Sequence, residues 1–257
     1  RSSHDAAMVG TTIYVAGGWR LGQGAEGGTP ATAVWAEDVV TLDFAALDQG
    51  WQSIGSPFKR RAVGVAVQQG KLAVIGGLTP ERDVSREVSL LDPATGTWSR
   101  GADYPGDAFG IATRTHDGHV IASARDGIVR RLDEAGWTDI GSLTFPRFFH
   151  QLVASDTGIV AVGGITGMNN IGRTRHSERV ATSGVSVQEF SLTYPGAAKN
   201  RQGLVSFRDS VYFFGGNNSL GQHDFAPQNV VREGWRFHLP SLSFAEVGDY
   251  PHARQTM

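Results

Sequence analysis

A short apolar run that closes on Gly-Gly occurs four times in the chain, and this constrains the fold more than any other feature. The runs are IYVAGG at 13–18, LAVIGG at 72–77, IVAVGG at 159–164 and VYFFGG at 211–216. If the long interval between the second and third runs holds two units, one of which has lost its diglycine, these two units average about 43–44 residues each. Repetition at this length indicates a β-propeller, in which every repeat is one four-stranded sheet.

The second unit shows the pattern most completely. Apolar runs at 62–67 and 72–77 flank a short turn, a third run lies at 88–91, and a fourth begins at Trp98 before the closing Tyr104-Pro105. Glycine permits positive φ and close backbone approach where the second strand ends, and the Trp supplies apolar area for packing one sheet on the next. Each unit is therefore predicted to form four antiparallel strands joined by short reversals.

The whole chain divides into four-stranded units of this kind. The third unit has Ser123-Ala124 in place of the diglycine, and the fourth lacks the Trp. We predict an all-β fold with five complete four-stranded blades and the start of another, with approximate bounds of 1–57, 58–105, 106–146, 147–195, 196–251 and 252–257. Because an open ring leaves strand edges and apolar faces uncovered, we expect further residues outside this sequence. A five-bladed ring in which the terminal segment pairs with the first unit is the alternative.

With these features the chain resembles the kelch-repeat β-propellers, a group that includes galactose oxidase-like propellers. The resemblance rests on the apolar runs, the diglycines and the spaced Trp, and it extends from Arg1 to Pro251. It implies six or seven blades in the complete protein and is specific for fold rather than function. It also brings two activities into consideration. Copper-radical oxidases need a Tyr cross-linked to Cys, and in sialic acid mutarotases a rim Arg and nearby acids handle a sugar carboxylate.

Composition excludes several functions. Lys and Arg total 23 against 25 Asp and Glu, without a block of like charge, so neither nucleic acid nor a membrane surface is indicated as a partner. The absence of cysteine excludes disulfides, thiolate metal sites and copper-radical chemistry of the galactose oxidase type. No apolar stretch of about 18 residues is present, so no transmembrane segment is predicted. No signal peptide is visible, but a chain that begins at Arg1 leaves the compartment open.

Strand order predicts which segments share one face of the propeller. In a four-stranded up-and-down blade, the link between blades and the link between the second and third strands open on the same side. Alignment of the unit starts on their apolar runs places six residues at one position: His4, Arg61, Phe109, His150, Arg201 and Arg254. The loops after the diglycines add Trp19, Asn217 and Asn218 to the same rim. Arg guanidinium groups, side-chain amides and an aromatic ring together favour a carboxylate, sulfate or sugar acid as ligand.

A structural role competes with binding for each of these basic residues. An Arg before an innermost strand can donate hydrogen bonds to backbone carbonyls of the neighbouring blade and so fix the spacing of the blades. Further basic residues lie beside the aligned position, namely Lys59, Arg60, Arg147 and Lys199. Only the convergence of the whole set on one channel mouth favours ligand binding.

No cofactor and no metal are predicted. His176, Glu178, His223 and Asp224 are metal-ligand types, but their spacing matches no known metal site, and polar loop residues are the commoner explanation. The candidates for general acid–base catalysis are His150, His223 and Asp224.

The leading interpretation is a non-catalytic propeller that binds a partner on the Arg/His-lined rim of the central channel. This partner is an acidic protein segment or an anionic glycan. One alternative is a carbohydrate-active enzyme of the sialic acid mutarotase type that uses the same funnel. Another is a purely architectural propeller within a multidomain protein. The sequence specifies neither the ligand nor the oligomeric state.

Overall fold

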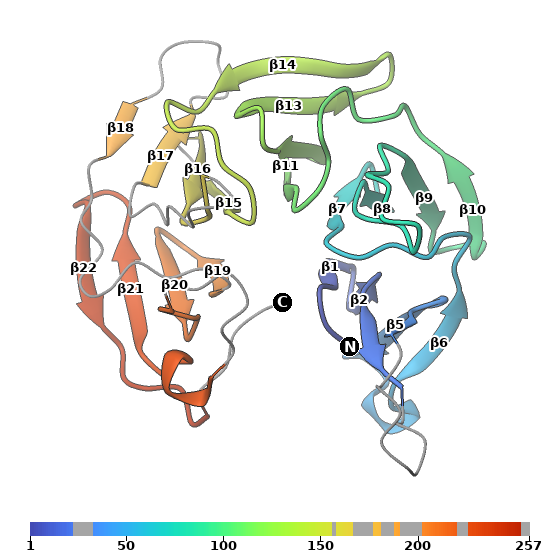
Figure 1. The fold of residues 1–257 in the computed structure, drawn as a ribbon, viewed down its shortest axis with the longest axis horizontal. Coiled ribbons are helices and arrows are strands. Elements are labelled where there is room, and N and C mark those ends of the chain that lie inside the picture. Colours follow the sequence, from blue (N-terminus) through green and yellow to red (C-terminus); the bar gives the residue numbers. More distant parts are fainter. Residues whose placement is uncertain are drawn as a thin grey trace. The chain divides into compact units, whose positions relative to one another are not determined.

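The structure is a computed structural model that describes residues 1–22, 33–155, 158–166, 177–180, 188–190, 202–219 and 226–252. These residues form five antiparallel sheets of four strands each (Figure 1). The first sheet contains β1 (Asp5–Val9), β2 (Thr12–Ala16), β5 (Asp38–Asp43) and β6 (Gln52–Gly55). The second contains β7 (Gly64–Gln68), β8 (Lys71–Ile75), β9 (Val88–Asp92) and β10 (Thr97–Arg100).

The other three sheets are built in the same way. The third contains β11 (Ala112–His116), β12 (His119–Ser123), β13 (Ile128–Asp133) and β14 (Gly136–Ser142). The fourth contains β15 (Gln151–Ser155), β16 (Gly158–Val162), β17 (Ser177–Val180) and β18 (Gln188–Phe190). The fifth contains β19 (Gly203–Phe207), β20 (Ser210–Phe214), β21 (Gly234–His238) and β22 (Ser243–Glu246). Because each strand pairs with the next strand of its unit, the predicted all-β fold of four-stranded units is confirmed.

A two-stranded ribbon stands outside the five sheets. It consists of β3 (Trp19–Leu21) and β4 (Ala33–Trp35) and follows the first diglycine, where the sequence predicted a loop. The helical elements among the described residues are two 3-10 turns, η1 (Leu47–Gln49) and η2 (Pro227–Asn229). Neither helix has the length or apolar character needed to cross a membrane.

The chain divides into two compact units. One holds the described residues up to Val120 together with Leu132–Trp137, and the other holds Ile121–Arg131 and the described residues from Thr138 onward. The first two sheets belong to the first unit and the last two sheets to the second, while the third sheet contributes residues to both.

The diglycines end the second strand of four sheets in a conformation that only glycine adopts easily. All eight of these glycines have φ between 63° and 105°. Space is equally restrictive, because a Cβ built on Gly18 would lie 2.6 Å from the carbonyl oxygen of Ser2, and one on Gly77 would lie 2.6 Å from that of Arg61. The predicted role of the diglycines in positive φ and close backbone approach is therefore confirmed.

Within the first unit, β7 is the edge strand of its sheet and contacts β1 and β11. Side chains of these two strands form hydrogen bonds with the backbone of β7. The backbone N–H of Val65 donates to Asp5 Oδ2 (2.8 Å), and the Val65 carbonyl accepts from Thr113 Oγ1 (3.1 Å). The N–H of Val67 donates to Thr115 Oγ1 (2.7 Å). These bonds pair backbone groups that a first strand would otherwise leave open at the sheet edge.

Apolar side chains pack the first sheet on the second. The buried members of this core come from both sheets and from the segment that joins them: Tyr14, Ala16, Val39, Phe58, Val63, Val65, Leu72, Val74 and Leu91. A second core joins the fourth and fifth sheets through Val153, Val160, Val162, Val211, Phe213 and Phe237. Inner strands such as β8 and β16 are buried over most of their length, as expected for strands that are covered on both faces.

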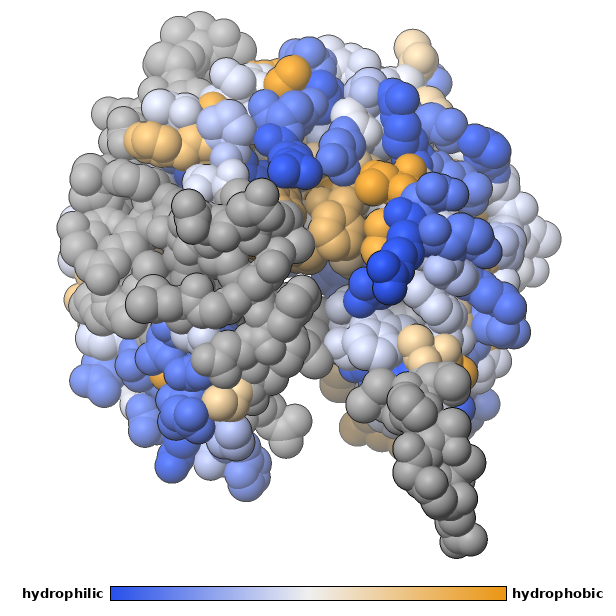
Figure 2. Space-filling model, viewed as in Figure 1, coloured by the Kyte–Doolittle hydropathy of each residue, from blue (hydrophilic) through white to orange (hydrophobic). Residues whose placement is uncertain are grey.

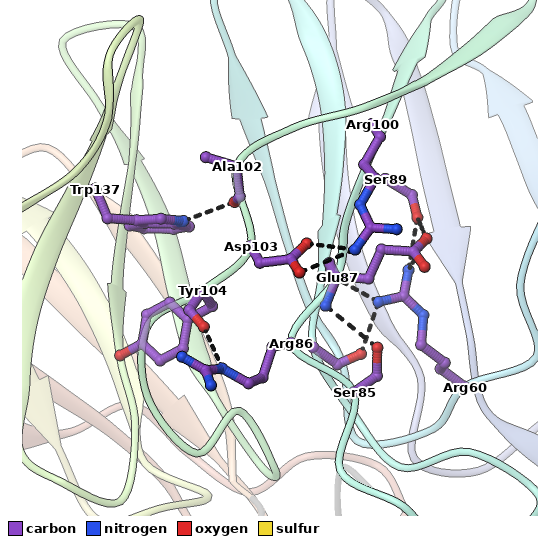
Figure 3. A network of polar contacts seen from close by, with 11 residues as sticks. Arg60, Ser85, Arg86, Glu87, Ser89, Arg100, Ala102, Asp103, Tyr104 and Trp137 are labelled. Carbon is purple, nitrogen blue, oxygen red and sulfur yellow. Dashed lines mark hydrogen bonds and ion pairs between the residues drawn. The ribbon is translucent and has the colours of Figure 1, made fainter.

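Trp residues of the fourth strands join consecutive sheets in the first unit. The indole N–H of Trp98 donates to the Gly55 carbonyl (3.0 Å), and the ring meets Phe58 edge-on at 5.5 Å between centroids. Trp137 repeats this with the Ala102 carbonyl (2.9 Å) and Tyr104 (5.1 Å), as Figure 3 shows. The predicted use of Trp in sheet-to-sheet packing holds at both positions.

Candidate functional site

Backbone bridges fix the register of the segments that lead into the first strands. Ser2, Arg61 and Phe148 each pair with the residue that follows a diglycine. The next residues, Ser3, Ala62 and Phe149, all have φ between 52° and 55°. These segments therefore have one conformation, and Arg61 corresponds to Ser2 and Phe148.

The two histidines stand two positions later than Arg61. A Cβ on Gly18 would approach His4 and one on Gly164 would approach His150, whereas the equivalent atom on Gly77 would approach Val63. The predicted alignment of Arg61 with His4 and His150 is therefore wrong by two residues. The alignment used the apolar runs, which have no sharp start, and the bridges follow the diglycines instead.

Phe109 does share its register with Arg61. The N–H of Gly110 donates to the Ala62 carbonyl (3.2 Å), as the N–H of Ala62 donates to the Ser3 carbonyl (2.8 Å). Gly110 also has positive φ, so the residue before it lies at the same point of the repeat as Arg61.

Arg60, next to Arg61, is a structural residue. Its Nη1 donates to the carbonyls of Gly76 (3.0 Å) and Glu87 (2.7 Å), and its Nη2 donates to Ser89 Oγ (2.7 Å) (Figure 3). The side chain is buried, and burial lowers the pKa of Arg60 to about 10, although the nearby Glu87 opposes the shift. The guanidinium remains charged at neutral pH and cross-links the second and third strands of its own sheet.

Arg1 and Arg147 repeat this role in the first and fourth sheets. Each immediately precedes the bridged residue, as Arg60 does. Arg1 forms an ion pair with Asp38, and Arg147 forms one with Glu178 while its Nη1 donates to the Gly163 carbonyl (3.1 Å). Arg147 and Glu178 are fully buried. The predicted bonds from such an Arg to backbone carbonyls are present, but they join strands of its own sheet and not of the neighbouring blade.

Arg61 has a different environment. Trp19 and Trp35 are directly paired residues of the β3–β4 ribbon, and the guanidinium carbon of Arg61 lies 5.7 Å from the centroid of each indole. Backbone bonds of Arg61 to Leu78 in both directions hold the residue in place. We call Arg61, Trp19 and Trp35 the Arg61 cradle. Trp35 was not predicted as a site residue, because the ribbon that carries it follows a Gly-rich run that the sequence indicates as a loop.

The Arg61 cradle holds polar atoms without a protein partner. Within the described ranges, the Arg61 Nε and the Trp19 Nε1 are buried and make no hydrogen bond. Burial lowers the pKa of Arg61 and the neighbouring Arg82 adds to the effect, but an Arg remains cationic at neutral pH. A guanidinium that lies close to two indole rings and has an unpaired N–H is suited to a planar anion.

The two histidines differ in exposure. His4 is exposed, and its pKa is lowered by partial burial and by the nearby positive charges of the N-terminus and Arg1. His150 is buried, and neither of its ring nitrogens has a hydrogen-bond partner among the described residues. Burial and the charge of Arg147 lower the pKa of His150 to about 3. His4 is thus accessible to a ligand, whereas His150 lies in the protein interior.

Of the remaining predicted site residues, Asn217 and Asn218 lie within the described residues and two arginines do not. Asn217 is buried, and its Oδ1 accepts a hydrogen bond from the Ser219 N–H (2.8 Å), which is the bond of an Asx turn. The Asn218 N–H donates to the Asn229 carbonyl (2.9 Å). Arg201 and Arg254 lie outside the described residues, so their part in a rim stays a prediction.

The described residues give little support to the candidates for metal binding and acid–base catalysis. Glu178 belongs to the buried pair with Arg147, and its carboxylate accepts the Thr144 N–H. The other candidates, His176, His223 and Asp224, lie outside the described residues. No cluster of three or more His, Asp or Glu side chains in the described parts of the chain could hold a metal ion.

Asp5 is a titratable residue that sequence reasoning missed. Its two carboxylate oxygens accept the N–H groups of Ala6 and Val65, both at 2.8 Å. Burial raises the pKa of Asp5 to about 6, although these hydrogen bonds and the charge of Arg114 oppose the shift. The signal available in the sequence was a single acid at the head of an otherwise apolar first strand.

Figure 2 shows hydrophilic residues over much of the described surface in that view, with hydrophobic residues in smaller groups between them.

Comparison with known proteins shows the fold class. No protein family and no curated protein matches the chain. A solved structure titled "Structure of YjhT" is similar with a TM-score of 0.77 and 15% sequence identity, over 99% of this chain and 85% of that chain. YjhT is a β-propeller, and the five four-stranded sheets of this chain have the fold of that class. At this identity the likeness shows the fold alone.

Proposed function

We propose that the chain is a non-catalytic, kelch-type β-propeller that binds a sugar acid of an anionic glycan at the Arg61 cradle. The observation that supports this most directly is the position of the Arg61 guanidinium against two indole faces, with its Nε unpaired among the described residues. Arg60 beside it already forms the hydrogen bonds that tie the second and third strands of the sheet together, so the Arg61 side chain is available to a ligand.

The chemistry of the Arg61 cradle favours a sugar acid over a simple anion. The guanidinium can donate two parallel hydrogen bonds to a carboxylate, and each charge-assisted bond contributes about 1.5–3 kcal/mol. Indole rings offer flat apolar faces for the C–H face of a sugar, and the Trp19 N–H is a donor for a hydroxyl. His4 is exposed and lies beside Gly18, which precedes Trp19 in the chain.

The wider Arg/His rim is part of the same proposal. Arg201 and Arg254 would add positive charge for longer anionic chains, while Asn217 and Asn218 would shape the rim near the fifth sheet. An acidic protein segment would use the same guanidinium but gain less from the two indole faces. A glycan is therefore the preferred ligand.

Calorimetric titration with D-glucuronate, with D-glucose as the neutral control, tests the proposal. The chain is expected to bind glucuronate and not glucose, and Arg61→Ala is expected to weaken glucuronate binding about 10–100-fold. Arg100→Ala is the matched control, because Arg100 is an exposed Arg of the same sheet that pairs with Asp103 three residues later. The combined variant of Arg61, Arg201 and Arg254 to Ala extends the test to the rim. Equal affinity in the original chain and in Arg61→Ala would refute the assignment.

The mutarotase-type alternative lacks a comparable observation. Its described acid–base candidate, His150, is buried and electrically neutral at physiological pH. The glucuronate samples also permit a direct check, since faster exchange between the two anomers in NMR spectra would favour an enzyme.

A further inference from the structure

The segment at 78–84 repeats the backbone arrangement of the β3–β4 ribbon. Leu78 directly follows the second diglycine and pairs with Val84, as Trp19 follows the first diglycine and pairs with Trp35. In both segments the next residue closes the hairpin on the second glycine: the Ala36 N–H donates to the Gly18 carbonyl (3.0 Å), and the Ser85 N–H donates to the Gly77 carbonyl (2.9 Å). We call residues 78–84 the 78–84 hairpin, which is thus the equivalent of the ribbon in the next repeat.

Arg61 connects these two hairpins within the first compact unit. Its backbone N–H donates to the Leu78 carbonyl (3.0 Å), and its carbonyl accepts the Leu78 N–H (2.8 Å). Its guanidinium carbon lies 5.7 Å from each indole of the ribbon. Since one residue contacts the ribbon through its side chain and the 78–84 hairpin through its backbone, the 78–84 hairpin lies directly beside the Arg61 cradle.

The 78–84 hairpin presents an apolar side chain and a cation, as the Arg61 cradle does. Val84, which pairs with Leu78, is 41% exposed. Arg82 is exposed, and within the described ranges its side chain forms neither an ion pair nor a hydrogen bond, although Glu81 and Asp83 flank it in sequence. Burial lowers the pKa of Arg61 and the positive charge of Arg82 lowers it further, so the two guanidinium groups lie within electrostatic reach of each other.

The turn of the 78–84 hairpin holds Arg82 in an unfavourable backbone conformation. Its φ is 70°, which glycine adopts without strain and other residues do not. Hydrogen bonds centred on Thr79 fix the turn: the Thr79 N–H donates to the Asp83 carbonyl (3.0 Å), the Arg82 N–H donates to the Thr79 carbonyl (3.0 Å), and the Asp83 N–H donates to Thr79 Oγ1 (3.3 Å). An exposed Arg at this point therefore has a conformational cost that packing does not explain, as is common at binding sites.

We infer that the 78–84 hairpin is a second subsite of the Arg61 cradle and that the ligand is a glycan with acid groups on two neighbouring sugars. The inference rests on the proposed function and deepens it by naming the substrate class. Arg61 would bind the carboxylate of one sugar and Arg82 that of the next, while the apolar face of the second sugar contacts Val84. The second carboxylate would also offset the repulsion between the two guanidinium groups.

Calorimetric titration of the 257-residue chain with three probes tests the inference. The probes are D-glucuronate, a disaccharide of glucuronate β-1,4-linked to glucose, and a disaccharide of two β-1,4-linked glucuronates. Comparison of the two disaccharides isolates the second carboxylate. We expect it to strengthen binding about fivefold to tenfold at low salt, and this gain should shrink as sodium chloride is added.

Arg82→Gln removes the second cation at an exposed position. It should reduce the gain from the second carboxylate to less than about twofold and change the affinity for D-glucuronate by less than about twofold. Arg100→Ala, the matched control, should keep the full gain. Val84→Ser should weaken the binding of both disaccharides about twofold to threefold without affecting D-glucuronate, because the second sugar alone would lie on Val84.

The outcomes separate the second subsite from the proposed function. Equal affinity of the original chain for the two disaccharides, or an undiminished gain in Arg82→Gln, would overturn the second subsite and leave Arg61 as the site for a single acid. If Arg61→Ala binds all three probes as tightly as the original chain, the proposed function fails, and the second subsite that depends on it is overturned as well.

Discussion

At the scale of single residues, the contrast between Arg60 and Arg61 explains most of the site. Both are basic residues of one short run, and the sequence alone does not say which of them turns toward the sheet. The positive φ of Ala62 and the bridge of Arg61 to Leu78 decide this, because they direct Arg60 to the carbonyls of its own sheet. The Arg61 side chain therefore lies against the β3–β4 ribbon, a segment that the sequence indicates only as a Gly-rich loop.

The buried pair of Arg147 and Glu178 gives a stability prediction. Arg147→Met leaves the Glu178 carboxylate buried without its cation, so the free energy of unfolding should fall by about 3–5 kcal/mol in urea denaturation. The double variant Arg147→Met, Glu178→Gln should recover part of this loss, because no charge then remains buried. Arg100→Ala should change the stability by less than about 0.5 kcal/mol. A loss for Arg147→Met as small as for Arg100→Ala would contradict the structural role.

His150 and Asp5 give opposite contributions to the pH dependence of stability. The pKa of His150 is about 3 in the folded chain and 6.5 in the unfolded chain, so between these values the unfolded chain binds more protons and acidification destabilises. The pKa of Asp5 is about 6 when folded and 3.8 when unfolded, so in that window the folded chain binds more protons and acidification stabilises.

Variants separate these two contributions. His150→Leu should make stability less sensitive to acidification by up to about 1.4 kcal/mol per pH unit, and Asp5→Asn should make it more sensitive. Urea midpoints measured between pH 4.5 and 7.5 provide the slopes. If His150→Leu and the original chain have the same slope, His150 does not stay neutral in the folded state.

At the scale of the strand and turn, the diglycines set the register on which the site depends. Their second glycines approach the backbone of the segment leading into a first strand, as Gly77 approaches Arg61. The sequence predicted the fourfold repeat of these turns and their need for positive φ. It did not predict the register of the adjacent segments, because apolar runs align equally well with a shift of two residues.

Gly77→Ala and Gly96→Ala form a matched pair that tests this close approach. Both glycines have positive φ, at 96° and 69°, but a Cβ on Gly96 meets no atom within 4 Å. Gly96→Ala should cost about 1–2 kcal/mol for the left-handed conformation alone. Gly77→Ala should cost about 1–3 kcal/mol more because the backbone must move. Equal losses in urea denaturation would show that close packing at the diglycine is unimportant.

The Trp residues of the fourth strands give a second comparison between elements. Trp137→Phe removes the hydrogen bond to the Ala102 carbonyl and should cost about 1 kcal/mol, with some further loss of packing on Tyr104. Trp51→Phe should cost less than about 0.5 kcal/mol, because Trp51 is exposed and makes no hydrogen bond in the described structure. Thermal unfolding of both variants measures the difference, and a larger loss for Trp51→Phe would contradict the packing role assigned to Trp137.

At the scale of the whole molecule, the fourfold recurrence of the apolar run and diglycine was enough to predict sheets of four strands and the β-propeller class. It was sufficient because each repeat is a local unit whose strands pair in sequence order. Trp35 and Asp5 escaped prediction for a different reason. Their importance comes from contacts with other segments, with Arg61 in one case and with Val65 in the other.

Binding at the Arg61 cradle can be observed directly in the indole N–H signals of the six tryptophans during titration with D-glucuronate. We predict that the signals of Trp19 and Trp35 shift together and saturably, that those of Trp98 and Trp137 do not move, and that Arg61→Ala abolishes the shifts. Equal shifts with D-glucose, or no movement of Trp19 and Trp35 with glucuronate, would contradict the assignment of an anion-binding site to Arg61.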